Sequence, residues 1–202
     1  MKRYSVLFSQ LLSVVFHPFF IPTYLFVLCR VLFFNGLGRI MYLYDSFWVS
    51  LFFICLFTAV IPLLSVLILY KTGQVTSIAL KNAKERRYPY LITLISYATL
   101  AFLLYKAGNP FCFYVYFAIV CLALVATINL VWKISAHMTA FGGLMAIVMF
   151  QSYVMGLNPY SLFAVLFTLA GLIASARIRL ESHDLPQILV GFLLGFSLLL
   201  FL

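Results

Sequence analysis

Charged residues are scarce in this chain, and acidic residues are the scarcest of all. Only 8% of its 202 residues are charged, four of them Asp or Glu, while 66% are hydrophobic. A soluble domain carries about 25% charged residues, and no polar stretch here is long enough to form one. The composition therefore excludes a soluble enzyme and predicts an all-α, integral membrane protein with several transmembrane helices.

Cysteine gives no sign of a disulfide framework. The four cysteines lie within apolar runs and have no CxxC spacing, a pattern typical of small buried side chains. A metal or haem site could be built from His17, His137 and His183, but no cysteine or carboxylate stands at ligand spacing beside them. We therefore expect neither a metal nor a cofactor.

Seven apolar stretches are candidates for membrane-spanning helices of about 20 residues. They cover residues 9–34, 47–70, 90–105, 111–132, 138–155, 160–175 and 186–202. Proline in His17-Pro18 predicts a kink or an interfacial start in the first stretch. Gly191 and Gly195 form a GxxxG pair suited to close helix packing. We expect one domain, 1–202, a bundle of six or seven helices with a two-helix segment, 1–75, before a core, 76–202.

The excess of basic residues points to an anionic partner. Thirteen Lys and Arg against four acids give a net charge of +9. Most of these residues flank apolar stretches, which argues against nucleic-acid binding and favours anionic lipid, cytoplasmic loops or an anionic substrate. We expect the chain to lie in a bacterial inner (cytoplasmic) membrane.

Three polar clusters interrupt the apolar pattern: the first cluster, 81–89, the second cluster, 132–143, and the third cluster, 176–187. Polar groups at membrane depth are costly unless they have partners, so each cluster is a candidate functional site. One apolar hairpin separates the first cluster from the second, and another separates the second from the third. Because each hairpin crosses the membrane and returns, we expect all three clusters on one side.

The clusters hold groups that suit a phosphate. Lys81, Lys84 and Arg87 recur every three residues, roughly on one helix face. The second cluster places Ser135 and His137 at the start of a helix, where backbone N–H groups favour anions.

The third cluster holds Arg177, and it places His183 and Gln187 four residues apart, on one helix face. Taken singly, each cluster fits a structural interpretation: a basic loop on lipid, a satisfied histidine at a helix end, or an Arg177–Glu181 pair. Taken together, two histidines beside several cations predict phosphoryl transfer. One histidine attacks phosphorus and the other protonates the leaving oxygen.

The clusters resemble the three motifs of the type 2 phosphatidic-acid phosphatase superfamily of membrane phosphatases. Those motifs read Lys-x6-Arg-Pro, Pro-Ser-Gly-His and Ser-Arg-x5-His-x3-Asp. Here the matching segments read Lys81-x6-Tyr88-Pro89, Ile134-Ser135-Ala136-His137 and Ala176-Arg177-x5-His183-x3-Gln187.

The resemblance implies a phosphatase core of that family in residues 76–202 and a metal-free reaction on a lipid phosphate. His183 would be the nucleophile that forms a phosphohistidine, and His137 would protonate the leaving group. The implied phosphate ligands are Lys81, Arg87, Ser135 and Arg177. The activity implied is that of a phosphatase or phosphotransferase, a hydrolase of phosphoric monoesters or pyrophosphates.

Departures from the motifs open a second interpretation. Gln187 stands where the family has aspartate, Ala136 where it has glycine and Tyr88 where it has arginine. Gln187 can orient His183 but supplies no charge, so turnover is expected to be slow or absent. The neighbouring Asp184 is expected to point elsewhere if a helix has already begun. The alternative is an inactive relative that binds or moves an anionic lipid.

Overall fold

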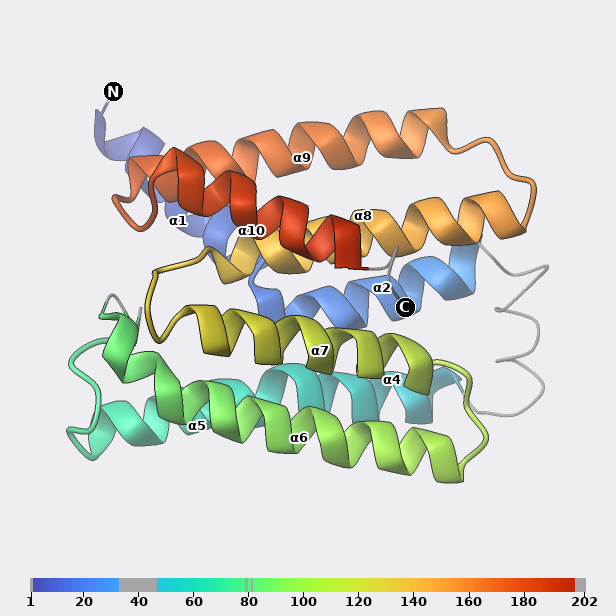
Figure 1. Ribbon diagram of the computed structural model, residues 1–202, viewed down its shortest axis with the longest axis horizontal. Coiled ribbons are helices and arrows are strands. Elements are labelled where there is room, and N and C mark those ends of the chain that lie inside the picture. The colour runs from blue at the N-terminus through green and yellow to red at the C-terminus, as the bar shows by residue number, and fades with distance from the viewer. Residues whose placement is uncertain (1, 33–46, 79, 81, 199–202) are drawn as a thin grey trace. The chain divides into compact units, whose positions relative to one another are not determined.

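Helices form every regular element in the described part of the chain. The computed structural model describes residues 2–32, 47–78, 80 and 82–198 (Figure 1). Its α-helices are α1 Lys2–Val15, α2 Ile21–Leu32, α4 Phe47–Cys55, α5 Ile61–Lys71, α6 Arg87–Lys106, α7 Cys112–Ile128, α8 Ala136–Val154, α9 Tyr160–Arg179 and α10 Leu185–Leu198. Three short elements join them: the 3-10 helices η1 Pro18–Phe20 and η4 Ala83–Arg86, and the π-helix η3 Leu56–Val60. The all-α prediction is confirmed for these residues.

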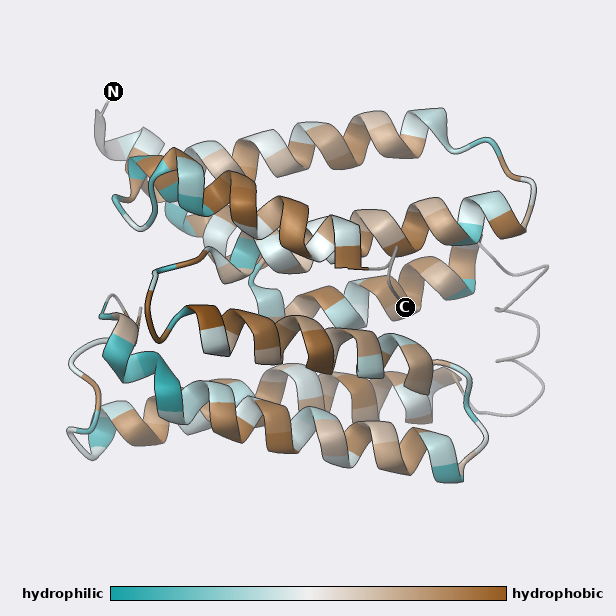
Figure 2. Cartoon of the chain, viewed as in Figure 1, coloured by the Kyte–Doolittle hydropathy of each residue, from teal (hydrophilic) through white to brown (hydrophobic). Residues whose placement is uncertain are grey.

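Within the described residues, four helical stretches are long and apolar enough to cross a membrane. They are Tyr4–Val31, Phe47–Lys71, Ala83–Lys106 and Tyr160–Arg179, while α7 and α10 are shorter apolar helices. Large apolar side chains point outward from the helices, as a lipid solvent allows. Hydrophilic residues gather near the helix ends and in the connections, as Figure 2 shows.

The described chain divides into two compact units. The terminal unit comprises Met1–Ile21 and Trp132–Leu202, and the central unit comprises Pro22–Val131. The terminal unit contains α1, α8, α9 and α10, and the central unit contains α4, α5, α6, α7 and all of α2 but its first residue. The division expected at residues 75 and 76 rests on motif positions and stays a prediction.

Glycines let α8 and α10 approach closely in the terminal unit. A Cβ atom added at Gly191 would lie 2.8 Å from the carbonyl oxygen of Ser135, and one at Gly195 would overlap the backbone of Thr139. Gly142 on α8 faces the backbone of Phe192 in the same way. The GxxxG pair therefore lies in a helix contact that leaves no room for a methyl group.

The expected interruption at His17-Pro18 is present in the terminal unit. Helix α1 ends at Val15, and α2 begins at Ile21 after the one-turn helix η1. Pro18 occupies the first turn of η1, and the Nδ1 atom of His17 accepts a hydrogen bond from the Phe19 N–H at 3.4 Å. Proline cannot donate to the preceding turn, so the α-helix stops before it.

The central unit contains a π-helical turn, η3, inside the membrane-length stretch Phe47–Lys71. Pro62 carries no N–H, so the carbonyl of Thr58, four residues earlier, loses its usual helical donor. The helix widens into η3, and side chains of α6 supply donors: Ser96 Oγ reaches the Phe57 carbonyl at 2.6 Å, and the Tyr97 hydroxyl reaches that of Thr58 at 3.5 Å. These bonds tie α6 to the bulge.

Candidate functional site

The third cluster lies on the connection between α9 and α10. Helix α9 ends in a Schellman motif, in which the Ser182 N–H donates to the Arg177 carbonyl at 3.0 Å and the Glu181 N–H to that of Ile178 at 2.9 Å. Glu181 adopts a left-handed φ of +50°. At the same position after α5, α6 and α8 the chain has glycine: Gly73, Gly108 and Gly156. A left-handed non-glycine residue beside His183 marks a strained turn, a feature that clusters at functional sites.

His183, Gln187 and Asp184 form a hydrogen-bonded chain. The Nδ1 atom of His183 lies 2.8 Å from Oε1 of Gln187, and Nε2 of Gln187 donates to Oδ2 of Asp184 at 3.1 Å. The other oxygen of Asp184 accepts from the Gln187 N–H at 2.9 Å and so caps α10. His183 and Gln187 do lie within hydrogen-bond distance, although His183 precedes α10 and the two do not share a helix face; the orienting role of Gln187 stays a prediction. Asp184 was expected to point elsewhere only if a helix had already begun, and that condition is not met, because α10 begins at Leu185 and leaves Asp184 at its cap.

The second cluster meets the third through the backbone of Ser135. The Ser135 N–H donates to the Gln187 carbonyl at 3.3 Å, and the Ser135 carbonyl accepts from the Thr139 N–H at 3.0 Å. Ser135 occupies the N-cap position of α8, but its side chain makes no capping bond. Its Oγ atom is fully buried and has no hydrogen-bond partner among the described residues. An unpartnered buried hydroxyl is rare in native structures.

His137 is buried just inside the start of α8. Its Nε2 atom lies 3.0 Å from the carbonyl oxygen of Ser13 on α1. A carbonyl only accepts, so Nε2 carries the hydrogen and Nδ1 is the atom that can gain or lose a proton. Burial lowers the pKa of His137 well below its usual value, and the positive charges of Arg177 and His17 lower it further. The imidazole of His137 is therefore neutral at neutral pH.

His17 belongs to the same neighbourhood, although the sequence pointed to it only as a kink or as part of a metal site. Its ring centroid lies 5.1 Å from that of His137, with the two rings nearly perpendicular. The signal was a polar stripe at intervals of four, Ser5, Ser9, Ser13 and His17. Ser9 and Ser13 are buried, while apolar neighbours of α1 are exposed.

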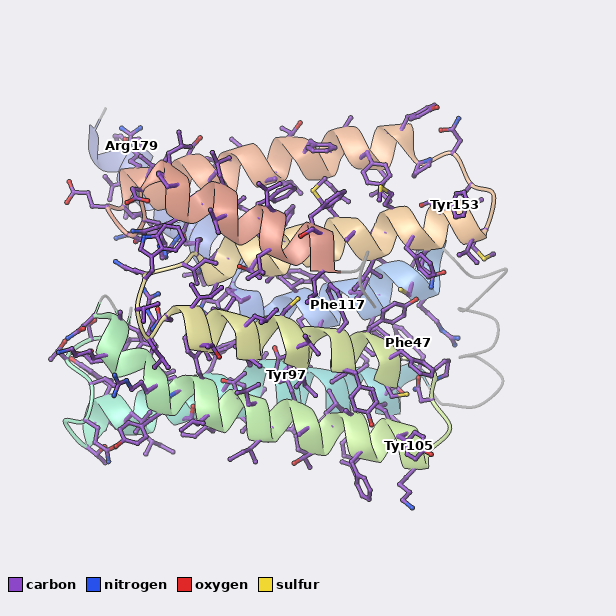
Figure 3. The ribbon with its side chains drawn as sticks, in the orientation of Figure 1. Phe47, Tyr97, Tyr105, Phe117, Tyr153 and Arg179 are labelled. Atoms are coloured by element: carbon purple, nitrogen blue, oxygen red, sulfur yellow. The ribbon has the colours of Figure 1, made fainter. Side chains whose placement is uncertain are left out.

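A hollow of about 280 Å³ opens at His183. It is lined by Lys133, Glu181, Ser182, His183, Asp184 and Gln187. Figure 3 labels Arg179 at the end of α9 where this connection lies, and Tyr153 near the opposite end of α8. The hollow therefore lies at one end of the terminal unit, where hydrophilic side chains gather.

No group of three or more His, Cys, Asp or Glu residues able to hold a metal ion occurs in the ranges that the structure describes. His17, His137 and His183 all lie in the terminal unit, but they do not form such a group there. A metal-ion site built from these three histidines thus has no geometric support.

The first cluster lies in the central unit and divides into structural and exposed residues. Arg86 is buried: its Nε donates to the Leu80 carbonyl at 2.9 Å, and its Nη1 lies 3.4 Å from Oδ1 of Asn129. Arg87, the first residue of α6, is exposed, as is Lys84. Lys81 lies outside the described residues. The predicted role of Lys81 and Arg87 as phosphate ligands stays a prediction.

The structure therefore brings the second and third clusters together within the terminal unit. Ser135 and Gln187 share a hydrogen bond, and Lys133 and His183 line one hollow. The positive charge of Arg177 contributes to the lowered pKa of His137. No protein-family profile, no curated protein and no solved structure matches the chain. The motif resemblance is thus the only ground for a family assignment, which stays a proposal.

Proposed function

We propose that the chain is a membrane lipid-phosphate phosphatase or phosphotransferase that uses His183 as its nucleophile. The observation that carries this proposal is the oriented imidazole of His183 at a hollow lined by polar and charged residues, in one unit with His137 and Arg177. Gln187 accepts a hydrogen bond from Nδ1 of His183, so in the neutral ring the lone pair lies on Nε2. A neutral imidazole nitrogen is a competent nucleophile towards phosphorus.

The proposed reaction has two steps. In the first, Nε2 of His183 forms a bond to phosphorus, the P–O bond to the lipid breaks, and the leaving oxygen takes a proton from Nδ1 of His137. In the second, water attacks the phosphohistidine, gives a proton to His137 and releases phosphate and His183. His137 must be protonated for the first step, and a bound phosphate dianion beside Arg177 would favour that form by offsetting the guanidinium charge.

The buried hydroxyl of Ser135 supports an anion site here. Its Oγ lacks a partner among the described residues, and a phosphate oxygen would accept its hydrogen. In this proposal Arg177 and Ser135 of the terminal unit bind phosphate, and the phosphate-binding roles expected of Lys81 and Arg87 stay predictions. We also propose that the chain has six or seven membrane spans and a core like that of the type 2 phosphatidic-acid phosphatases. Its proposed location is a bacterial inner membrane.

A second candidate function is the binding or transport of an anionic lipid without turnover. The carboxylates of Glu181 and Asp184 line the hollow beside His183, and they disfavour a dianionic phosphate there. Gln187 supplies no charge to stabilise a phosphohistidine. These two features favour a slow or inactive site.

The test is phosphate release by the detergent-purified protein from phosphatidate, phosphatidylglycerol phosphate and undecaprenyl pyrophosphate. His137→Asn is expected to lower kcat about 10²- to 10⁴-fold, and His183→Asn to abolish turnover and phosphohistidine formation. Activity that survives both substitutions rules out the mechanism.

Substitutions of two arginines on α9 distinguish phosphate binding by Arg177 from an effect of the positive surface charge. Arg177→Gln is expected to lower kcat/KM about 10- to 100-fold, because a charge-assisted hydrogen bond to phosphate is lost. Arg179→Gln, an exposed residue two positions later, should leave kcat/KM close to that of the parent protein. If the parent protein and Gln187→Asp both bind the lipid phosphate but release no phosphate, the second candidate function is supported.

A further inference from the structure

We propose that Asp184 is a positioning residue that sets the tautomer of His183 through the amide of Gln187. This inference rests on the proposed role of His183 as nucleophile. It assigns a function to a carboxylate that the motif comparison passes over, and it explains how a site with glutamine in place of aspartate can orient its histidine.

The orientation of the Gln187 amide follows from hydrogen-bond chemistry. A carboxylate at neutral pH only accepts, so the side-chain atom of Gln187 at 3.1 Å from Asp184 Oδ2 is the NH2 nitrogen. The amide oxygen is then the atom at 2.8 Å from His183 Nδ1. That oxygen also only accepts, so Nδ1 must carry a hydrogen. In the neutral ring, Nε2 is left with the lone pair.

Asp184 is well suited to hold this arrangement. Its Oδ1 is engaged by the Gln187 N–H at 2.9 Å, so the carboxylate is fixed at the start of α10 and its Oδ2 is directed at the same residue's side chain. The two bonds fix both the main-chain N–H and the side-chain amide of Gln187. A negative charge two hydrogen bonds from the ring also favours a cationic phosphohistidine.

Helix capping alone offers a simpler explanation of Asp184, and one substitution distinguishes the two roles. Asparagine caps helices about as well as aspartate, so Asp184→Asn can retain the bond from the Gln187 N–H. The NH2 group of the substituted side chain would then face the Gln187 amide, which must turn its oxygen towards that group and its own NH2 towards His183. Nδ1 of His183 would have to accept, and the hydrogen would move to Nε2.

The experiment is ¹⁵N NMR of the protein labelled at its histidine rings, in detergent micelles and at a pH where imidazole is neutral. The signals of His183 are assigned by their loss in His183→Asn. In the parent protein we expect the Nδ1–H tautomer to exceed the Nε2–H tautomer by about tenfold or more, the effect of one good hydrogen bond. Asp184→Asn should reverse this ratio, and Gln187→Met should bring it close to that of free imidazole.

Glu181→Gln is the matched control. It removes a carboxylate from the same hollow but from a residue with no hydrogen bond to Gln187 in the structure, so it should leave the tautomer ratio as in the parent protein. Melting temperatures measured in parallel report the loss of the cap. An unchanged ratio in Asp184→Asn, an Nε2–H tautomer in the parent protein, or an equal shift in Glu181→Gln would overturn the inference.

The NMR readout needs no turnover, so it separates this inference from the proposed function. A parent protein that shows the Nδ1–H tautomer but releases no phosphate would contradict the phosphatase and leave the role of Asp184 intact. Phosphatase activity with an unchanged ratio in Asp184→Asn would do the reverse. If both hold, Asp184→Asn should lower kcat while KM changes little.

Discussion

The contact between α8 and α10 should respond sharply to a single methyl group. In Gly195→Ala the new Cβ would overlap the Thr139 carbonyl and lie 2.8 Å from the Gly143 nitrogen, whereas ordinary contacts begin at 3.4 Å. Both neighbours are backbone atoms and cannot rotate away. The two helices must therefore separate by about half an ångström or more, which forfeits a quarter to a half of the dispersion energy of each contact across the gap.

The expected cost follows from this separation. Overpacking of this kind destabilises a protein by about 1–3 kcal/mol. Gly171→Ala on α9 is the matched control, because a Cβ there meets nothing within 4 Å. That substitution should stabilise the protein by about 0.5–1 kcal/mol through helix propensity alone. The two variants, identical in chemistry, should thus differ by about 1.5–4 kcal/mol.

Thermal unfolding of both variants in one detergent measures the difference. At about 2–4 °C for each kcal/mol in a chain of this size, Gly195→Ala should melt several degrees below the parent protein and Gly171→Ala slightly above it. Equal shifts in the two variants would refute the close α8–α10 contact. Gly191→Ala, whose Cβ would press on the Ser135 carbonyl, should also impair any phosphatase activity, because that contact holds Ser135 beside Gln187.

Three further predictions concern single side chains. The lowered pKa of His137 means that the unfolded chain binds a proton more readily than the folded one, so stability should fall as the pH drops below about 6.5, and His137→Phe should flatten that pH dependence of the melting temperature. Arg86→Gln should cost about 1–3 kcal/mol in chemical denaturation, because the Leu80 carbonyl and Oδ1 of Asn129 lose their buried donor, whereas exposed Arg87→Gln should cost little. Glu181→Gly should raise the melting temperature by relieving a left-handed φ that costs about 1 kcal/mol, and an unchanged or lower value would argue against strain at this turn.

The local features of the third cluster could be predicted because they depend on spacing along the chain. His183 and Gln187 stand four residues apart and do form a hydrogen bond. Whether Asp184 faces Gln187 also depends on a local detail. If α10 began one residue earlier, this carboxylate would point away; because the helix begins at Leu185, the carboxylate caps it and binds Gln187. The position of a helix start is uncertain by one or two residues in a sequence-based prediction.

The histidine at position 17 could not be placed in the same way. It lies 120 positions before His137, and nothing in its own segment indicates which helix its ring will face. The stripe Ser5, Ser9, Ser13 and His17 marks a polar face of α1, but only packing within the terminal unit shows that this face meets His137.

The amino-acid sequence by itself determined that the protein is helical and built for a membrane, because scarce charge and long apolar runs leave no other way to satisfy the backbone. It also determined where the polar clusters lie. Only the tertiary structure decided which of them meet, because a hydrogen bond such as Ser135–Gln187 joins residues that chain spacing does not relate. The same holds for the glycines of α8 and α10. Their lack of a side chain matters only because the backbone of the other helix lies against them in the folded protein.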